Sequence, residues 1–287
     1  MFGTLAALGV AWLCAFGLLF SPADRDQRES VRIMYVHVPS AWVAYLAFGV
    51  TAVASALYLL RSSHSLTWDR LAGASAEIGV LFMGVTLVTG MLWGRLSWGV
   101  FWTWDARLTS TAFLFVTFLG YLAVRRLGGT QHQRAKRSAV LAMLGVLEIP
   151  LVHFSVRLWR SLHQDATVAR IDGDPDLDGL MLFSLFVGLI AFTLLYVWLV
   201  IHRQRALVLE GALEDSRSRR RTRRTSRRGR AAGWWTLMED AGFVIGSYVV
   251  VFGGIAAYAA TMISGRGGSR GVPDADKSDT MDLTPWT

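Results

Sequence analysis

Seven runs of mostly apolar residues constrain the fold of this chain more than any other feature. They fall near 2–20, 40–60, 72–94, 108–124, 138–154, 179–201 and 240–263. About 20 apolar residues suffice for a helix to cross the hydrocarbon core of a bilayer. Hydrophobic residues also make up 53% of the chain, and charged residues only 17%. The sequence therefore predicts an all-α integral membrane protein: a six-helix transmembrane bundle followed by a seventh, C-terminal helix.

The spacing of these runs divides the chain into four parts. Residues 1–205 are expected to form the six-span domain. Residues 206–239 are an Arg-rich linker, and we expect disorder over 203–239 because that stretch is rich in Arg and Ser. An additional transmembrane helix is expected at 240–263, and a disordered tail at 264–287.

Basic residues predict how the chain is oriented. Cytoplasmic loops of membrane proteins carry an excess of Lys and Arg. The loop 125–137 holds four Arg and one Lys, whereas the loop 155–178 is rich in Asp. We therefore expect the N-terminus, the loop 125–137 and the linker to be cytoplasmic, and the loops 21–39, 95–107 and 155–178 to lie outside. Membrane topology explains the net charge of +8, so no nucleic-acid partner is expected.

An unusual cluster of aromatic residues lies between the third and fourth runs. The stretch 98–109 reads W-G-V-F-W-T-W-D-A-R-L-T. If it were helical, its residues at i, i+3 and i+4 would share one face. That face would hold Trp98, Phe101, Trp102 and Asp105, a flat aromatic surface with a carboxylate at its edge. One interpretation is an ordinary interfacial belt; the other is a wall for a large planar ligand.

Three of the six histidines fall on the expected outer side: His37, His153 and His163. A single interfacial histidine is usually a polar cap, but two beside an aromatic surface favour a ligand. Haem needs imidazole on its iron, apolar walls and cations for its propionates. His37 and His163 could approach the iron from opposite sides. The candidate cations are Arg32, Arg95, Arg107 and Arg157.

Several motifs resemble one family. In addition to the Trp-rich stretch, the chain contains Y-V-H-V-P-S-A-W at 35–42, L-W-G at 92–94, I-P-L-V-H-F-S-V at 149–156 and S-L-H-Q-D-A-T at 161–167. Together they resemble the CcmC family, the haem exporter proteins C of system I cytochrome c maturation. The resemblance covers about 20–205. Members of the family often have Trp at the position of Phe101.

The resemblance implies a six-helix inner-membrane protein that binds haem b transiently at the outer face. It also implies that His37 and His163 are the axial ligands and that the Trp-rich segment holds the haem edge, with His153 in a packing role. The haem-binding residues are then expected to be His37, His163, Trp98, Phe101, Trp102, Trp104, Asp105 and Arg107.

The same resemblance implies partners. The family presents haem to the chaperone CcmE, and the ABC subunits CcmA and CcmB then release the loaded chaperone. A small membrane protein, CcmD, supports the complex, and the segment 240–263 faintly resembles it. No enzymatic activity is expected, since the chain has no phosphate-binding G-x-x-x-x-G-K-[ST] loop. Any ATP hydrolysis would come from a partner.

Two other functions compete with haem transfer. A membrane-embedded b-type cytochrome would place paired histidines on facing helices, whereas here they are expected at loop level. A small-molecule transporter would show broken helices or an inverted repeat, and neither is evident. Glu77 and Glu148 lie within apolar runs. Each is either part of a route between helices or a carboxyl group bonded to a neighbouring helix.

Overall fold

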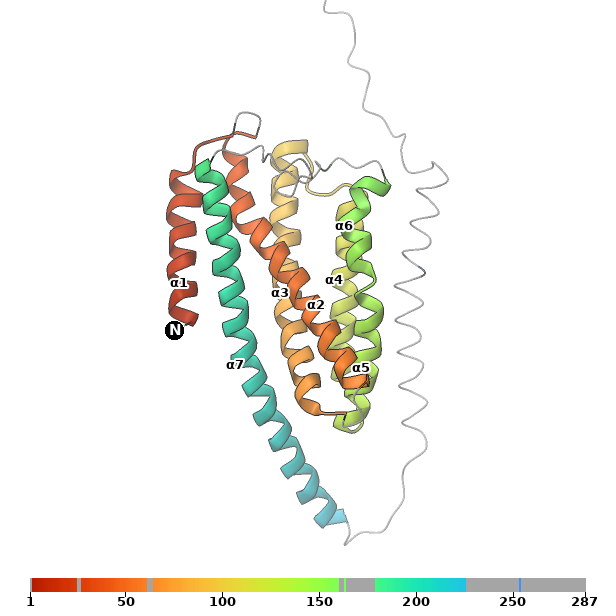
Figure 1. The fold of residues 1–287 in the computed structure, drawn as a ribbon. Coiled ribbons are helices and arrows are strands. Elements are labelled where there is room, and N and C mark those ends of the chain that lie inside the picture. The colour runs from red at the N-terminus through yellow and green to blue at the C-terminus, as the bar shows by residue number, and fades with distance from the viewer. Residues whose placement is uncertain are drawn as a thin grey trace, which may run out of the picture.

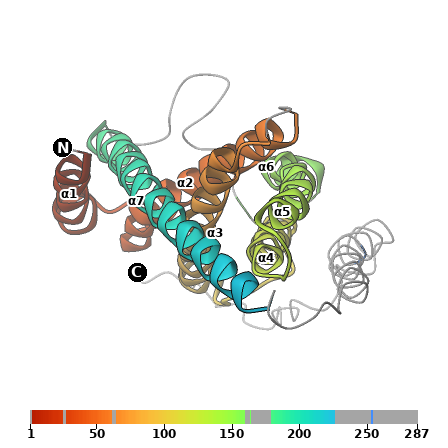
Figure 2. The ribbon, with the colours of Figure 1, turned by 90° about the horizontal axis from the view of Figure 1, so that it is seen from below.

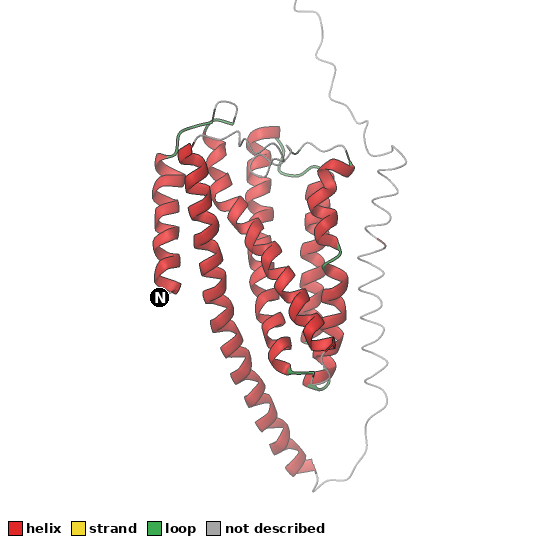
Figure 3. Cartoon of the chain, in the orientation of Figure 1, coloured by secondary structure: helices red, strands yellow, loops and turns green. Residues whose placement is uncertain are grey.

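The computed structural model describes residues 2–24, 27–60, 64–159, 163, 179–225 and 253. These residues form helices and loops, with no strand among them (Figure 3). In chain order the helices are α1 (Phe2–Trp12), η1 (Leu13–Phe20), η2 (Glu29–Ile33), α2 (Met34–Leu60), α3 (Leu66–Trp98), α4 (Ala106–Arg125), α5 (Gln131–Gly145), α6 (Glu148–Leu158) and α7 (Gly179–Thr225). The predicted all-α fold is confirmed.

Six helical segments of the described chain are long and apolar enough to cross a membrane. They match the first six predicted runs: Gly3–Phe20, Glu29–Leu60, Leu66–Trp98, Ala106–Arg125, Gln131–Leu158 and Gly179–Glu214. Several extend beyond the predicted runs, because capping and polar end turns add residues that hydropathy alone does not mark. The chain is therefore a multi-pass membrane protein.

The fifth span is interrupted between α5 and α6. Pro150 has no N–H and cannot bond to the carbonyl of Val146, four residues earlier. That carbonyl accepts a bond from Ile149 N at 3.2 Å instead. The buried Glu148 at this break accepts a bond from Thr117 Oγ1 of α4 at 2.9 Å. Of the two interpretations of Glu148, the structure therefore shows the carboxyl group bonded to a neighbouring helix.

Helices α2 and α3 form the centre of the bundle. Figure 2 shows α1 and α7 on one side of this pair and α4, α5 and α6 on the other. The ring of Phe48 on α2 stacks on Phe118 of α4, with centroids 3.7 Å apart. On the other side, the hydroxyls of Ser75 on α3 and Tyr196 on α7 lie 2.7 Å apart. Each central helix also packs on the other flank, since α2 contacts α7 and α3 contacts α4.

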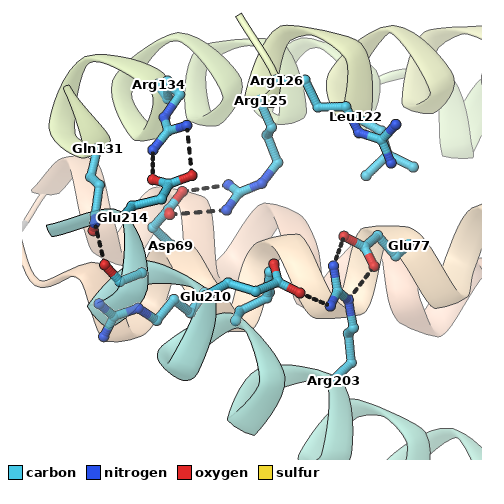
Figure 4. A pocket seen from close by; sticks show the side chains of 13 residues that line it. Asp69, Glu77, Leu122, Arg125, Arg126, Gln131, Arg134, Arg203, Glu210 and Glu214 are labelled. Carbon is cyan, nitrogen blue, oxygen red and sulfur yellow. Dashed lines mark hydrogen bonds and ion pairs between the residues drawn. The ribbon is translucent and has the colours of Figure 1, made fainter. Parts of the chain in front are cut away.

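We call the end of the bundle drawn at the top of Figure 1, with residues 27–33 and 99–105, the upper end, and the opposite one the lower end. At the lower end α7 continues beyond the other helices and crosses toward α5 (Figures 1 and 2). Ion pairs gather in a cleft there, and two of the four join α7 to another helix (Figure 4). They are Arg203–Glu77, Arg203–Glu210, Arg134–Glu214 and Arg125–Asp69.

The structure corrects three local expectations. Residues 99–105 are not helical, because α3 ends at Trp98 and Gly99 adopts a left-handed conformation with φ 78°. His37 lies within the first turns of α2 and not at the loop level that the sequence predicts. Residues 203–225, expected to be disordered, continue α7 as a helix. The segments 226–239, 240–263 and 264–287 lie outside the described residues, apart from Gly253.

Candidate functional site

A cavity of about 360 Å³ lies at the upper end, between α2, α3, α4 and α6. We call it the upper cavity. Its volume falls within the range of small-molecule binding sites. Both candidate iron ligands line it, as do His153 and Arg107. The structure thus brings together His37 and His163, which are 126 positions apart in the sequence.

Helix α2 contributes one face to the upper cavity. His37, Ala41 and Tyr45 follow each other at intervals of four residues and all line it. Opposite them, α3 contributes Gly90 and Trp93, three residues apart. Regular helical spacing therefore builds two walls from segments that are distant in sequence.

His37 is held by α3. Its Nδ1 lies 2.9 Å from the hydroxyl of Thr89. That hydroxyl has one hydrogen, and it donates this hydrogen to the backbone, with the Val85 carbonyl oxygen at 2.7 Å. With that hydrogen on the backbone, Nδ1 of His37 donates to Thr89, and Nε2 then carries the lone pair that a metal ligand requires.

His163 is held by the loop before α4. Its Nδ1 lies 2.8 Å from Oδ2 of Asp105, and the Asp105 side chain is only 2% exposed. Asp105 is also the N-cap of α4, where it accepts a bond from Arg107 N at 3.0 Å. An ionised carboxylate only accepts hydrogen bonds, so Nδ1 of His163 donates. Both histidines therefore present the same tautomer.

The aromatic residues do not form one flat surface. Trp98 packs edge-on against His163, with ring centroids 5.0 Å apart, and in the same way against Trp93. Of the aromatic residues in this group, only Trp93 lines the upper cavity. Phe101 and Trp104 are exposed, at 52% and 72%. Trp102 is half-buried and packs edge-on against Trp104. The loss of helical geometry after Gly99 explains this difference from the expected shared face.

Of the four arginines proposed for propionates, Arg107 lines the upper cavity and the others do not. Arg32 pairs with Glu29 at 2.7 Å and bonds to the carbonyl oxygen of Leu18. Arg95 bonds to the Gly99 carbonyl and lies over the ring of Phe101. These contacts support the loops of the upper end.

Sequence reasoning missed several residues that line the upper cavity or support His37. Thr89 and Gly90 lie in an ordinary apolar run, and nothing in their own sequence marks them. Trp93 is marked in the sequence only as part of the L-W-G motif that resembles the family. Among the described residues no cluster of three or more His, Cys, Asp or Glu side chains could hold a bare metal ion. Two imidazoles fit an iron whose other ligands come from a porphyrin.

Comparison with known proteins identifies the family. The family described as "Heme exporter protein C" matches residues 1–219. The chain belongs to this family. It is 43% identical to the heme exporter protein C of Bradyrhizobium diazoefficiens over 200 residues, which cover 69% of this chain and 75% of that protein. The corresponding protein of Haemophilus influenzae is 38% identical over 212 residues, covering 73% and 83%.

Relatives also occur in plants. A protein of Marchantia polymorpha, whose name includes the words "cytochrome c biosynthesis ccmC-like mitochondrial protein", is 36% identical over 207 residues. These cover 70% of this chain and 86% of that protein. The part that matches the family, residues 1–219, contains every residue of the upper cavity and the ion pairs of the lower end.

Proposed function

We propose that this protein handles haem in cytochrome c maturation, and that it binds haem in the upper cavity and passes it on. The observation that carries the proposal is the meeting of His37 and His163 in one cavity, each with Nδ1 bonded so that Nε2 is the basic nitrogen. The names of the relatives support the same role. Haem would be cargo, with binding and release as the protein's task.

The surrounding residues fit this cargo. Trp93 and Tyr45 give the cavity aromatic walls, which suit a planar apolar ring. Arg107 lines the same cavity and would meet a propionate. Trp98 would act by holding the ring of His163. Phe101, Trp102 and Trp104, on the loop at the same end, would cover the haem edge.

The proposal extends to haem type, partners and location. We propose that the haem is haem b, bound transiently, and that the acceptor is a CcmE-type chaperone. An ABC pair of the CcmA and CcmB type would release the chaperone, and a CcmD-like protein, separate or fused as residues 240–263, would support the assembly. The upper end would face the periplasm, with the N-terminus in the cytoplasm. No catalytic residue is assigned.

The first test is the visible absorption spectrum of the purified protein and of two variants. We expect a bis-imidazole haem spectrum, and we expect His37→Ala and His163→Ala each to lose or alter it. His132→Ala is the matched control, because His132 lies at the lower end beside Tyr58. Haem binding that survives both cavity substitutions unchanged would place the ligands elsewhere.

A second measurement separates transfer from electron transport. A haem-transfer protein should give up its haem to excess apomyoglobin, whereas a b-type cytochrome retains its haem. We therefore expect the haem band to move to myoglobin on mixing. Full retention over hours would favour the cytochrome alternative.

A further inference from the structure

The two cavity histidines have partners of unequal charge. Nδ1 of His163 bonds to the carboxylate of Asp105, while Nδ1 of His37 bonds to the neutral hydroxyl of Thr89. A hydrogen bond to a charged acceptor is roughly twice as strong as one between neutral groups. An anionic partner also raises the basicity of a ligating imidazole. The structure therefore makes His163 the stronger electron donor.

Asp105 contacts His163 without lining the upper cavity. Its side chain is buried, and it is not among the residues that line the upper cavity. The N-terminus of α4 holds it, since its carboxylate accepts from Arg107 N. Trp98 packs against the same imidazole at 79° to its plane. The ring of His163 is thus fixed by a bond at one edge and by an aromatic contact.

The hydrogen-bond partner of His37 is uncharged. Thr89 belongs to α3 itself, and its hydroxyl also bonds to the helix backbone. The neighbouring Gly90 leaves room beside the imidazole: a Cβ there would lie 3.1 Å from Cε1 of His37. Neither contact carries charge. His37 is therefore positioned without being strengthened as a ligand.

We propose that Asp105 is a positioning residue that makes His163 the retained ligand and leaves His37 as the ligand that exchanges first when haem is handed on. This inference rests on the proposed function. It changes the role expected for Asp105: the carboxylate acts through His163, without contact to the haem. The asymmetry offers a way to hold haem at one side while the other side becomes available to an acceptor.

The central test replaces Asp105 by Asn in the full-length protein. Asn keeps the shape, caps a helix as well as Asp does, and removes the charge. We expect haem to dissociate about tenfold faster, and the midpoint potential of the bound haem to become more positive, because an anionic partner stabilises ferric iron. Thr89→Val, the matched change behind His37, should alter the dissociation rate by less than about threefold.

A double-mutant cycle tests the asymmetry directly. In the parent protein, His163→Ala should release haem faster than His37→Ala. With Asn at position 105 this difference should shrink, since the two remaining imidazoles then have neutral partners. Equal rates for the two histidine variants in the parent protein would overturn the inference.

Two controls keep these outcomes interpretable. Asp105→Ser retains the helix cap but is too short to reach His163, so thermal unfolding of this variant shows whether the protein stays folded when only the contact to His163 is lost. In the haem-free protein, ¹⁵N NMR of labelled histidines should show the Nδ1–H tautomer for His163 and lose that preference in Asp105→Ser. An unchanged tautomer would contradict the positioning role. If the haem spectrum is unchanged in both His37→Ala and His163→Ala, the proposed function itself fails. Altered binding in His163→Ala with an unchanged Asp105→Asn overturns only the present inference.

Discussion

At the scale of single residues, the absence of a side chain at Gly90 leaves room for the ring of His37 in the upper cavity. Gly90 faces the ring of His37, and a Cβ at this position would lie 3.1 Å from Cε1 and 3.7 Å from Nδ1. The first distance is below ordinary van der Waals contact between carbon atoms. Because Thr89 holds Nδ1 from the same helix, the imidazole has little freedom to move away. A side chain at position 90 would therefore have to displace the ring of His37 by a few tenths of an ångström.

We expect Gly90→Ala to weaken haem binding about tenfold, because it tilts the imidazole and lengthens its bond to Thr89. The helix itself should not suffer, since Ala is the better helix former by about 1 kcal/mol. The measurement is a haem titration beside a thermal unfolding curve. Gly84→Ala is the control on the same helix, where a Cβ meets Phe115 at an ordinary 3.7 Å. Unchanged affinity in Gly90→Ala would show that the ring has more room than the structure indicates.

At the scale of elements, the lower half of α7 is fixed by charge as well as by apolar packing. Arg203 bonds to Glu77 of α3 through two nitrogens, Nε at 2.5 Å and the second terminal nitrogen at 3.0 Å. Further along α7, Glu214 pairs with Arg134 of α5. Glu77, a charged residue within an apolar run of the sequence, is thus the partner of Arg203, which lies 126 positions further along the chain. Its role is to join α3 to α7.

We expect Arg203→Ala to lower the free energy of unfolding by about 1–2 kcal/mol, since it leaves the half-buried Glu77 carboxylate without its bidentate partner. Arg205→Ala is the matched control, because Arg205 lies on an exposed position of the same helix. Both variants should retain the haem spectrum, as the site lies at the opposite end. The check is thermal unfolding in detergent. Equal stability of the two variants would mean that the ion pair contributes nothing measurable.

At the scale of the whole molecule, the two ends differ in chemistry. The upper end carries the cavity and the exposed aromatic residues Phe101 and Trp104. The lower end carries the ion pairs and the Arg-rich end of α7. A helix of 47 residues is about 70 Å long, more than twice the roughly 30 Å hydrocarbon core. A large part of α7 therefore lies beyond that core.

Cysteine labelling in intact cells tests the proposed orientation. Cys14 is the only cysteine, so Cys14→Ala provides a background without thiols. In this background we expect Trp104→Cys to react with a membrane-impermeant maleimide. Arg126→Cys, at the lower end, should react only after the cells are opened. The reverse pattern would put the upper cavity on the cytoplasmic side and contradict delivery to an external chaperone.

Local sequence determined the spans and the candidate ligands. Hydropathy marks a helix because each span must bury its own backbone bonds in lipid, so the six described spans could be predicted. His37 and His163 were identified from residue type and motif. The break at Pro150 also follows from local chemistry, because proline lacks the N–H that the helix needs.

Only the tertiary structure decided what supports those ligands. Asp105 was predicted to contact haem, but its bond to His163 exists because α4 begins where the 99–105 loop ends. Thr89 is an unremarkable residue of α3 until α2 packs beside it. Likewise, the composition of 203–225 suggests disorder, yet these residues continue α7 as a helix that is bonded to the bundle through Arg203. Spans follow from the solvent that each segment meets, whereas partners follow from which helices pack together, and no local pattern encodes that.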